Sequence, residues 1–185
     1  MTAIKFAREN KVPYFGLCYG MQLAAIEFAR NVAGLKSATT SENDPDAEHQ
    51  VVHSIPFDPR YQKIKGEGAS MRLGGYDCVL KPGSFVDKIY ADAKAYKDNV
   101  PHLVSERHRH RFEFNNIYRE PLEKAGLVIS GTSPDDMFVE MIELPKNMHP
   151  FFVATQAHPE YKSRPLQPHC LFVAFLKAAS KHKTN

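Results

Sequence analysis

The chain has 185 residues, of which 43% are hydrophobic and 24% charged, a length that suits one domain with a sizeable core and is short for two. Its net charge of +3 is too small for nucleic-acid binding through bulk electrostatics, and it has neither a signal-peptide pattern nor the apolar run of roughly 20 residues that a membrane helix needs. The sequence has three widely spaced cysteines, Cys18, Cys78 and Cys170, which argue against a disulfide framework and against a Cys-x-x-Cys metal site. We therefore expect a cytoplasmic protein. From its charge and hydropathy, we expect neither a nucleic-acid nor a membrane partner.

The first part of the chain is predicted to alternate between helix and strand. Apolar spacing predicts a short amphipathic helix over Thr2–Asn10. The uniformly apolar run Val12–Leu17 predicts a strand covered on both faces, and a period of 3.6 residues predicts a helix over Met21–Val32. The polar segment Ser37–Ser70 is interpreted as mobile loops around one short strand, Val51–Ile55.

The rest of the chain is predicted to be rich in short strands and to end in an amphipathic helix over Pro168–His182. Strands are expected at Met71–Leu73, Tyr76–Leu80, Leu127–Ser130, Phe138–Leu144 and Phe151–Gln156, with strand and loop over Val100–Phe114 and a short helix over Pro121–Ala125. Helices and strands alternate at both ends of the chain. The pattern predicts an α/β fold of three layers, in which helices flank a mainly parallel sheet with some antiparallel content.

Cys18 lies where the first predicted strand meets the following helix without a proper loop, in the segment Gly16-Leu17-Cys18-Tyr19-Gly20. Such a sharp turn lifts a side chain out of the carboxyl edge of the sheet, where open α/β sheets bind ligands. The helix N-terminus should lower the pKa of the thiol, and the flanking glycines permit the tight turn. We interpret Cys18 as a candidate nucleophile, the alternative being a buried structural cysteine.

A thiol nucleophile needs a base and a group that orients the base. His158 and Glu160 follow the predicted strand Phe151–Gln156 at its carboxyl end. Because they are two positions apart on an extended chain, their side chains point the same way, and the carboxylate can hold the imidazole. Most His-Pro-Glu tripeptides are surface turns, so the hypothesis depends on the presence of Cys18 in the same domain.

The sequence "FGLCYGMQ", followed at a distance by "HPE", resembles the class I, triad-type glutamine amidotransferases. Three further segments, "GASMRLGGYDC", "VSERHRHRFEFNN" and "HPEYKSRPLQPHCLFVAFLKAAS", resemble the glutaminase domain of the CTP synthase family, and the alternating Arg-His run is the most specific of them. The similarity extends from Ala3 to Ser180. It implies a flavodoxin-like, three-layer fold and a glutaminase domain over residues 1–185.

The resemblance implies roles for the residues already singled out. Cys18 would form a glutamyl thioester, His158 would act as general base and acid, and Glu160 would orient His158. The backbone N–H of Tyr19 would supply half of an oxyanion hole, because a backbone donor does not depend on the side chain. The segment Tyr19–Gln22, that is Tyr19, Gly20, Met21 and Gln22, would line the glutamine pocket.

Two more residues fall where the family binds substrate. Glu42 stands where the family has a carboxylate for the α-ammonium group of glutamine, although it is also typical of a solvated acid in an acidic loop. Arg111 ends the "RHRHR" run, which alternation divides into Arg107, Arg109 and Arg111 on one side and two histidines on the other. A basic patch for RNA or phosphate and a solvated charged face are the alternatives for this run.

The resemblance also implies partners outside these residues. An amidoligase domain would use ATP and Mg²⁺ to aminate UTP with the ammonia, in a parent enzyme that is a homo-oligomer, a tetramer. GTP would be an allosteric activator acting at the lid-like segment Arg60–Gly68, which carries Arg60, Lys63 and Lys65 and equally suits an ordinary surface loop. We expect no metal or cofactor in the glutaminase domain itself.

A glycine-rich oxyanion loop, which in the family lies upstream of the cysteine, does not occur before Cys18. We therefore expect the domain to be incomplete at its N-terminal edge. Two alternatives stay open: the glutaminase of another amidotransferase, such as GMP synthetase, and a catalytically inactive regulatory module of the same fold.

Overall fold

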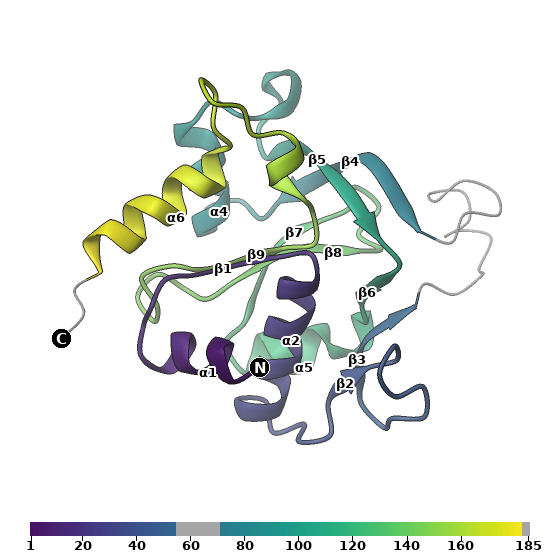
Figure 1. Ribbon diagram of the computed structural model, residues 1–185. Helices are drawn as coiled ribbons and strands as arrows, with labels where there is room; N and C mark the ends of the chain where they lie inside the picture. Colours follow the sequence, from purple (N-terminus) through teal and green to yellow (C-terminus); the bar gives the residue numbers. More distant parts are fainter. Residues whose placement is uncertain (55–70, 183–185) are drawn as a thin grey trace.

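The central layer is a six-stranded sheet in a computed structural model that describes residues 1–54 and 71–182. Its strand order is β1-β9-β8-β7-β4-β5 (Figure 1). The strands of this sheet are β1 (Tyr14–Leu17), β4 (Arg72–Leu80), β5 (Leu103–His110), β7 (Val128–Thr132), β8 (Val139–Glu143) and β9 (Phe152–Thr155). A smaller sheet of order β2-β3-β6 contains β2 (Thr39–Thr40), β3 (Gln50–Ser54) and β6 (Phe112–Phe114).

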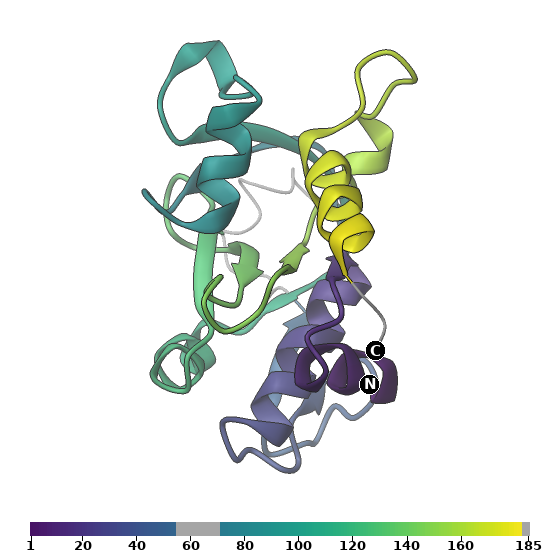
Figure 2. The ribbon, with the colours of Figure 1, turned by 90° about the vertical axis from the view of Figure 1, so that its left-hand side faces the viewer.

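Helices cover both faces of the larger sheet and complete the three layers (Figure 2). One face carries α1 (Thr2–Glu9), α2 (Tyr19–Asn31) and α5 (Arg119–Lys124), and the other carries α4 (Phe85–Asp92) and α6 (Cys170–Lys181). Short 3₁₀ helices are η1 (Lys97–Asn99), η2 (Asn116–Tyr118) and η3 (Pro159–Tyr161). None of the helices in the described ranges is both long and apolar enough to cross a membrane.

Strand β9 shows why the sheet is covered on both sides. Phe152 and Ala154 pack into the core beneath α2, whereas Phe151, just before the strand, and Val153 pack into the core beneath α4 and α6. All four side chains are completely buried. The continuous apolar run around β9 therefore contributes to both cores, as is typical of a strand that lies between two helical layers.

The three-layer α/β architecture is confirmed, but the prediction of a mainly parallel sheet is wrong in detail. Only β1 and β9 pair in parallel in the larger sheet, and its other pairings are antiparallel. The connections explain this difference. Residues 133–138 join β7 to β8 and residues 144–151 join β8 to β9, and links this short cannot make the crossover that parallel neighbours need.

Three other elements differ from expectation. Strand β2 forms in the polar segment that is predicted to hold only one short strand. The predicted strands Met71–Leu73 and Tyr76–Leu80 form one strand, β4, which continues through two glycines. Helix α4 is absent from the sequence prediction, although it has a capping signal: the Ser84 side chain accepts a hydrogen bond from the Asp87 N–H at 3.1 Å. The other expected helices and strands form within a few residues of their predicted bounds. The lid-like segment Arg60–Gly68 lies outside the described residues.

Candidate active site

Cys18 occupies a sharp turn between β1 and α2 and is the N-cap residue of α2. Its backbone angles, φ 49° and ψ −104°, lie in a region that non-glycine residues rarely adopt. Hydrogen bonds on both sides hold this strained conformation. The Cys18 N–H donates to Thr155 O at 2.8 Å, and the Cys18 carbonyl accepts from the N–H groups of Met21 and Gln22 at 3.0 and 3.2 Å.

The turn requires glycine at position 16, as the sequence predicts, whereas a Cβ atom on Gly20 would meet only the Tyr14 hydroxyl at an ordinary 3.5 Å. A Cβ atom on Gly16 would lie 2.9 Å from the backbone carbonyl of Gly20, closer than real contacts allow. The hydroxyl of Tyr14 closes the same corner by donating to Gly20 O at 2.7 Å. The backbone of β1 and the first turn of α2 therefore approach each other at a distance that only glycine permits at position 16.

His158 and Glu160 leave the same edge of the sheet as Cys18. Strands β1 and β9 are parallel neighbours in which Leu17 is opposite Thr155, so the chain continues into Cys18 on one strand and toward His158 on the other. The His158 Nδ1 lies 2.5 Å from Glu160 Oε1. Its Nε2 is buried and has no hydrogen-bond partner among the described residues, which leaves that nitrogen available to exchange a proton.

The electrostatics of the thiol differ from the sequence expectation. Burial raises the pKa of Cys18 above its ordinary value, and the carboxylates of Glu113 and Glu160 add to the increase. The backbone N–H of Tyr19 and the side chain of Gln156 act in the opposite direction by donating hydrogen bonds to the sulfur. The expected lowering of the pKa is therefore wrong for the free site, because desolvation outweighs the helix N-terminus.

Selective alkylation should still distinguish Cys18 from the other two thiols. Cys78 is only 1% exposed, and burial raises its pKa well above the ordinary value. Burial also raises the pKa of Cys170 to about 12. We expect iodoacetamide to modify Cys18 faster than either of them, because Cys78 is inaccessible and the Cys170 thiolate is scarce at neutral pH, as measured by peptide mass spectrometry of the folded protein. Equal rates at the three cysteines would contradict the assignment of Cys18 as the reactive thiol.

The four residues Tyr19–Gln22, expected to line a substrate pocket, form the first turn of α2. The side chain of Tyr19 is 45% exposed. Met21, by contrast, is completely buried in the core, so only its backbone can face a substrate. The Gln22 side chain is also buried, and its Nε2 is bonded to Phe112 O at 3.0 Å and to Gln156 Oε1 at 3.1 Å.

Glu42 and Arg111 lie at one end of the smaller sheet, and both are exposed. Glu42 lies two residues after the end of β2. The residue between them, Ser41, accepts a hydrogen bond through its Oγ from the Ser54 N–H at 3.1 Å. Ser54 is in turn opposite Phe112 in β6, next to Arg111. Because Gln22 bonds to Phe112 O, this end of the sheet adjoins the turn that carries Cys18. The structure thus brings the two predicted substrate residues toward the triad, without a side-chain contact to it.

The main chain of β5 borders the site, which the sequence reasoning did not foresee. The carbonyl oxygen of Arg107 accepts from the His158 N–H at 2.7 Å, and that of Arg109 lies 4.0 Å from Cys18 Sγ. The predicted alternation along this strand is confirmed: the three arginines of the run are exposed, while His108 and His110 are buried. The backbone contacts could not be inferred from residue types, because any residue supplies a carbonyl.

A buried ionic cluster beneath β5 was also missed. Arg72, 1% exposed, donates to Glu140 at 2.6 Å and to Glu113 at 3.2 Å. His108 and His110 lie beside it with their ring nitrogens 3.0 Å apart, and burial lowers the pKa of His110 to about 3, so both carboxylates face neutral imidazoles. A signal was present, since Glu140 lies inside an apolar strand and a buried carboxylate needs a cationic partner.

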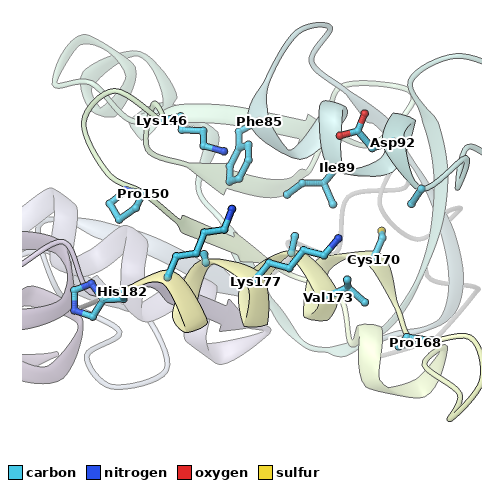
Figure 3. Close-up of a pocket in the computed structure, with 14 residues that line it drawn as sticks. Phe85, Ile89, Asp92, Lys146, Pro150, Pro168, Cys170, Val173, Lys177 and His182 are labelled. Atoms are coloured by element: carbon cyan, nitrogen blue, oxygen red, sulfur yellow. The ribbon is translucent and has the colours of Figure 1, made fainter. Parts of the chain in front are cut away.

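A groove of about 890 Å³ lies away from the triad, between α4 and α6 (Figure 3). The residues that line it include Ile89, Val173, Lys177 and Lys146, and the Lys146 ammonium lies 4.3 Å from the centre of the Phe85 ring. None of the predicted site residues lines it. Over residues 1–54 and 71–182, no group of three or more His, Cys, Asp or Glu side chains is arranged to hold a metal ion.

The chain is similar to proteins of one family. The model of the family "glutamine amidotransferase class-I" matches residues 1–178. A CTP synthase of Caldanaerobacter subterraneus subsp. tengcongensis is 55% identical over 185 residues, which are 100% of this chain and 32% of that protein. A CTP synthase of Koribacter versatilis is 48% identical over 183 residues, which are 99% of this chain and 31% of that protein.

A solved structure gives the same result for the fold. The structure described as the Trypanosoma brucei CTPS glutaminase domain with bound acivicin matches with a TM-score of 0.82 and 38% identity, over 99% of this chain and 66% of that chain. The chain spans roughly a third of the length of the curated relatives. The three-layer fold of this class is thereby confirmed, with a mixed sheet, and the chain belongs to the class I glutamine amidotransferase family.

Proposed function

We propose that this chain is the glutaminase part of a CTP synthase and hydrolyses L-glutamine to glutamate and ammonia with Cys18, His158 and Glu160. The observation that carries the proposal is the position of Cys18. It lies on a strained turn at the sheet edge from which the hydrogen-bonded His158–Glu160 pair also emerges. The match to the glutamine amidotransferase class-I family supports glutamine as the substrate, and the relatives named CTP synthase support the choice of parent enzyme.

In the first half of the reaction, the Cys18 sulfur attacks the side-chain carbonyl carbon of glutamine. His158 Nε2 takes the thiol proton, and the backbone N–H of Tyr19 stabilises the negative charge on the carbonyl oxygen. Collapse of the tetrahedral intermediate breaks the C–N bond. The proton held by His158 passes to the leaving nitrogen, which departs as ammonia and leaves a glutamyl thioester on Cys18.

In the second half, His158 takes a proton from a water molecule that attacks the thioester carbon. The C–S bond breaks, glutamate is released, and the proton returns to the Cys18 sulfur. Glu160 holds the Nδ1 side of the imidazole at 2.5 Å throughout, which keeps Nε2 directed at the reacting atoms and stabilises the imidazolium. The raised pKa of the free thiol is consistent with this role, because the proton remains on sulfur until His158 accepts it.

A glutaminase assay tests the proposal directly. The purified full-length protein that contains this chain, incubated with L-glutamine, should release glutamate and ammonia in equal amounts, measured by coupled enzymatic detection. Mass spectrometry of the acid-quenched reaction should find the thioester on Cys18. A folded protein that forms neither product would favour the inactive regulatory module instead.

Glu42 and Arg111 should bind the amino-acid end of glutamine, because both charges lie at the end of the smaller sheet that adjoins Cys18. We expect Glu42→Ala or Arg111→Ala to raise the KM for glutamine and to change kcat less. The loss of a charge partner is worth about 2–5 kcal/mol when the contact is desolvated. Steady-state kinetics measures this, with Lys36→Ala as the control for a surface cation. A wild-type KM in either variant would exclude that residue from the site.

We further propose that the ammonia serves the amination of UTP to CTP in a synthetase domain of the same, larger protein. That domain would supply the binding of ATP and Mg²⁺, and this chain's residues carry out none of those steps. GTP activation and a tetrameric parent enzyme belong to the same proposal. A cytoplasmic location is supported by the three free thiols, since none of the cysteines is paired.

A further inference from the structure

A short series of hydrogen bonds connects the smaller sheet to the sulfur of Cys18. It begins at Phe112 O, which accepts from Gln22 Nε2 at 3.0 Å. The same Gln22 Nε2 donates to Gln156 Oε1 at 3.1 Å, and Gln156 Nε2 lies 3.6 Å from Cys18 Sγ. Gln22 is 4% exposed and Gln156 is completely buried, so water does not compete for these bonds.

The Phe112 carbonyl determines which group donates and which accepts in each hydrogen bond of this series. Phe112 O is a backbone carbonyl that can only accept, so the amide of Gln22 must turn its NH₂ group toward it. That NH₂ group then also faces the Gln156 side chain, which must present its oxygen. The remaining Gln156 group, Nε2, consequently faces Cys18. The backbone of Gln156 is anchored as well, because its N–H donates to Glu140 O at 2.8 Å.

We propose that Gln156 is a positioning residue for the nucleophile: its side-chain N–H holds and stabilises the Cys18 sulfur, and Gln22 fixes the orientation of that N–H. The inference rests on the proposed function, in which Cys18 is the nucleophile. It gives Gln22 a role in addition to the predicted one. Its amide nitrogen donates to Phe112 O and to Gln156 Oε1, so Gln22 orients Gln156, and only its Oε1 is left for a contact with substrate.

The surroundings of Cys18 explain why such a donor is needed. Burial disfavours the thiolate, and two carboxylates, Glu113 of β6 and Glu160 after β9, disfavour it further. Two N–H groups favour the thiolate: the backbone N–H of Tyr19 at the start of α2, and the side-chain amide of Gln156 after β9. His158, which also follows β9, is the proposed acceptor of the thiol proton. Gln156 adds a neutral donor whose charge state does not change with pH.

The test is the rate of Cys18 alkylation by iodoacetamide as a function of pH, with no glutamine present. Gln156→Met keeps the length of the side chain but removes the donor. Gln156→Glu keeps the shape and can still accept from Gln22, but its carboxylate has no N–H. We expect both variants to react about ten- to a hundredfold more slowly below the midpoint of the profile, and the midpoint to move to higher pH, because a hydrogen bond to a charged group is lost.

Two further variants complete the design. Gln22→Met leaves the Gln156 donor in place but frees its amide to rotate, so we expect a smaller slowing than in Gln156→Met. Gln167→Glu, an exposed glutamine, is the control for the introduced charge and should react at the wild-type rate. Circular dichroism and thermal unfolding identify variants that are folded, and either Gln156 variant suffices for the test.

A wild-type rate and midpoint in a folded Gln156 variant would overturn the inference. The proposed function can fail separately, since alkylation does not require turnover. If the alkylation profile shifts as expected but the wild-type protein does not hydrolyse glutamine, Gln156 still positions the thiol and only the glutaminase assignment is wrong.

Discussion

Cys18→Ala is expected to abolish glutamine hydrolysis, lowering kcat by a factor on the order of 10⁴–10⁶, which is typical when a covalent nucleophile is removed. Without the sulfur no thioester forms, and the remaining residues can only polarise the amide. The change removes one half-buried atom, so the fold should persist. A coupled assay for glutamate, with thermal unfolding of the same sample, checks both statements.

The second half of this experiment uses ammonia in place of glutamine. In the full-length protein, Cys18→Ala should leave CTP formation from free ammonia unchanged, because this chain then has no chemical step to perform. Cys170→Ala is the matched control, since Cys170 lies on the far side of the sheet at the start of α6. Loss of activity with both nitrogen sources would show that Cys18 has a structural role.

That Cys18 and the His158–Glu160 pair leave the same edge of the sheet could be predicted from the sequence, because it depends on local signals. The apolar run before Cys18, the two glycines around it and the residues His158 and Glu160 after a second apolar run each act over a few residues. Parallel pairing of β1 with β9 then brings the two turns to one edge. The strand alternation of the Arg-His run was predictable for the same reason, since it depends only on the pleat of a strand.

Other features depend on contacts between distant residues, and the sequence does not reveal them. The partner of Glu140 is Arg72, 68 positions away, and no periodicity connects the two. The Gln22–Gln156 bond joins residues 134 positions apart. The prediction of mainly parallel strands was wrong because the length of the connections, and not the composition of the strands, decides whether neighbouring strands are antiparallel. The raised pKa of Cys18 likewise follows from burial, which becomes visible only in the folded chain.

The buried ionic cluster leads to the largest expected effect on stability. Arg72→Met removes the guanidinium that contacts Glu140 at 2.6 Å and Glu113 at 3.2 Å, where all three side chains are 1% exposed. We expect the free energy of unfolding to fall by about 3–5 kcal/mol, the cost of breaking a buried ion pair by removing one partner. Urea unfolding measures it. Arg119→Met, which breaks an ion pair with the mostly exposed Asp136, should cost about 1 kcal/mol or less.

The pH dependence of the same variant separates a charge effect from a packing effect. Burial raises the pKa of Glu140, and Arg72 opposes this rise. Without Arg72, the folded state should therefore hold a proton on this carboxyl at a pH where the unfolded state has already released it. Since the folded state then binds more protons, the stability of Arg72→Met should increase as the pH falls toward the ordinary pKa of glutamate, and its deficit relative to wild type should shrink.

Adding Glu113→Gln and Glu140→Gln to Arg72→Met provides the decisive comparison. Replacing a whole buried ionic group by neutral residues is often close to neutral, whereas removing one member is costly. The triple variant should therefore recover much of the lost stability at neutral pH. If it is as unstable as Arg72→Met at every pH, the contribution of Arg72 does not come from the two carboxylates but from its contacts with the rings of Tyr76 and Phe138, whose centres lie 4.5 Å and 4.6 Å from its guanidinium.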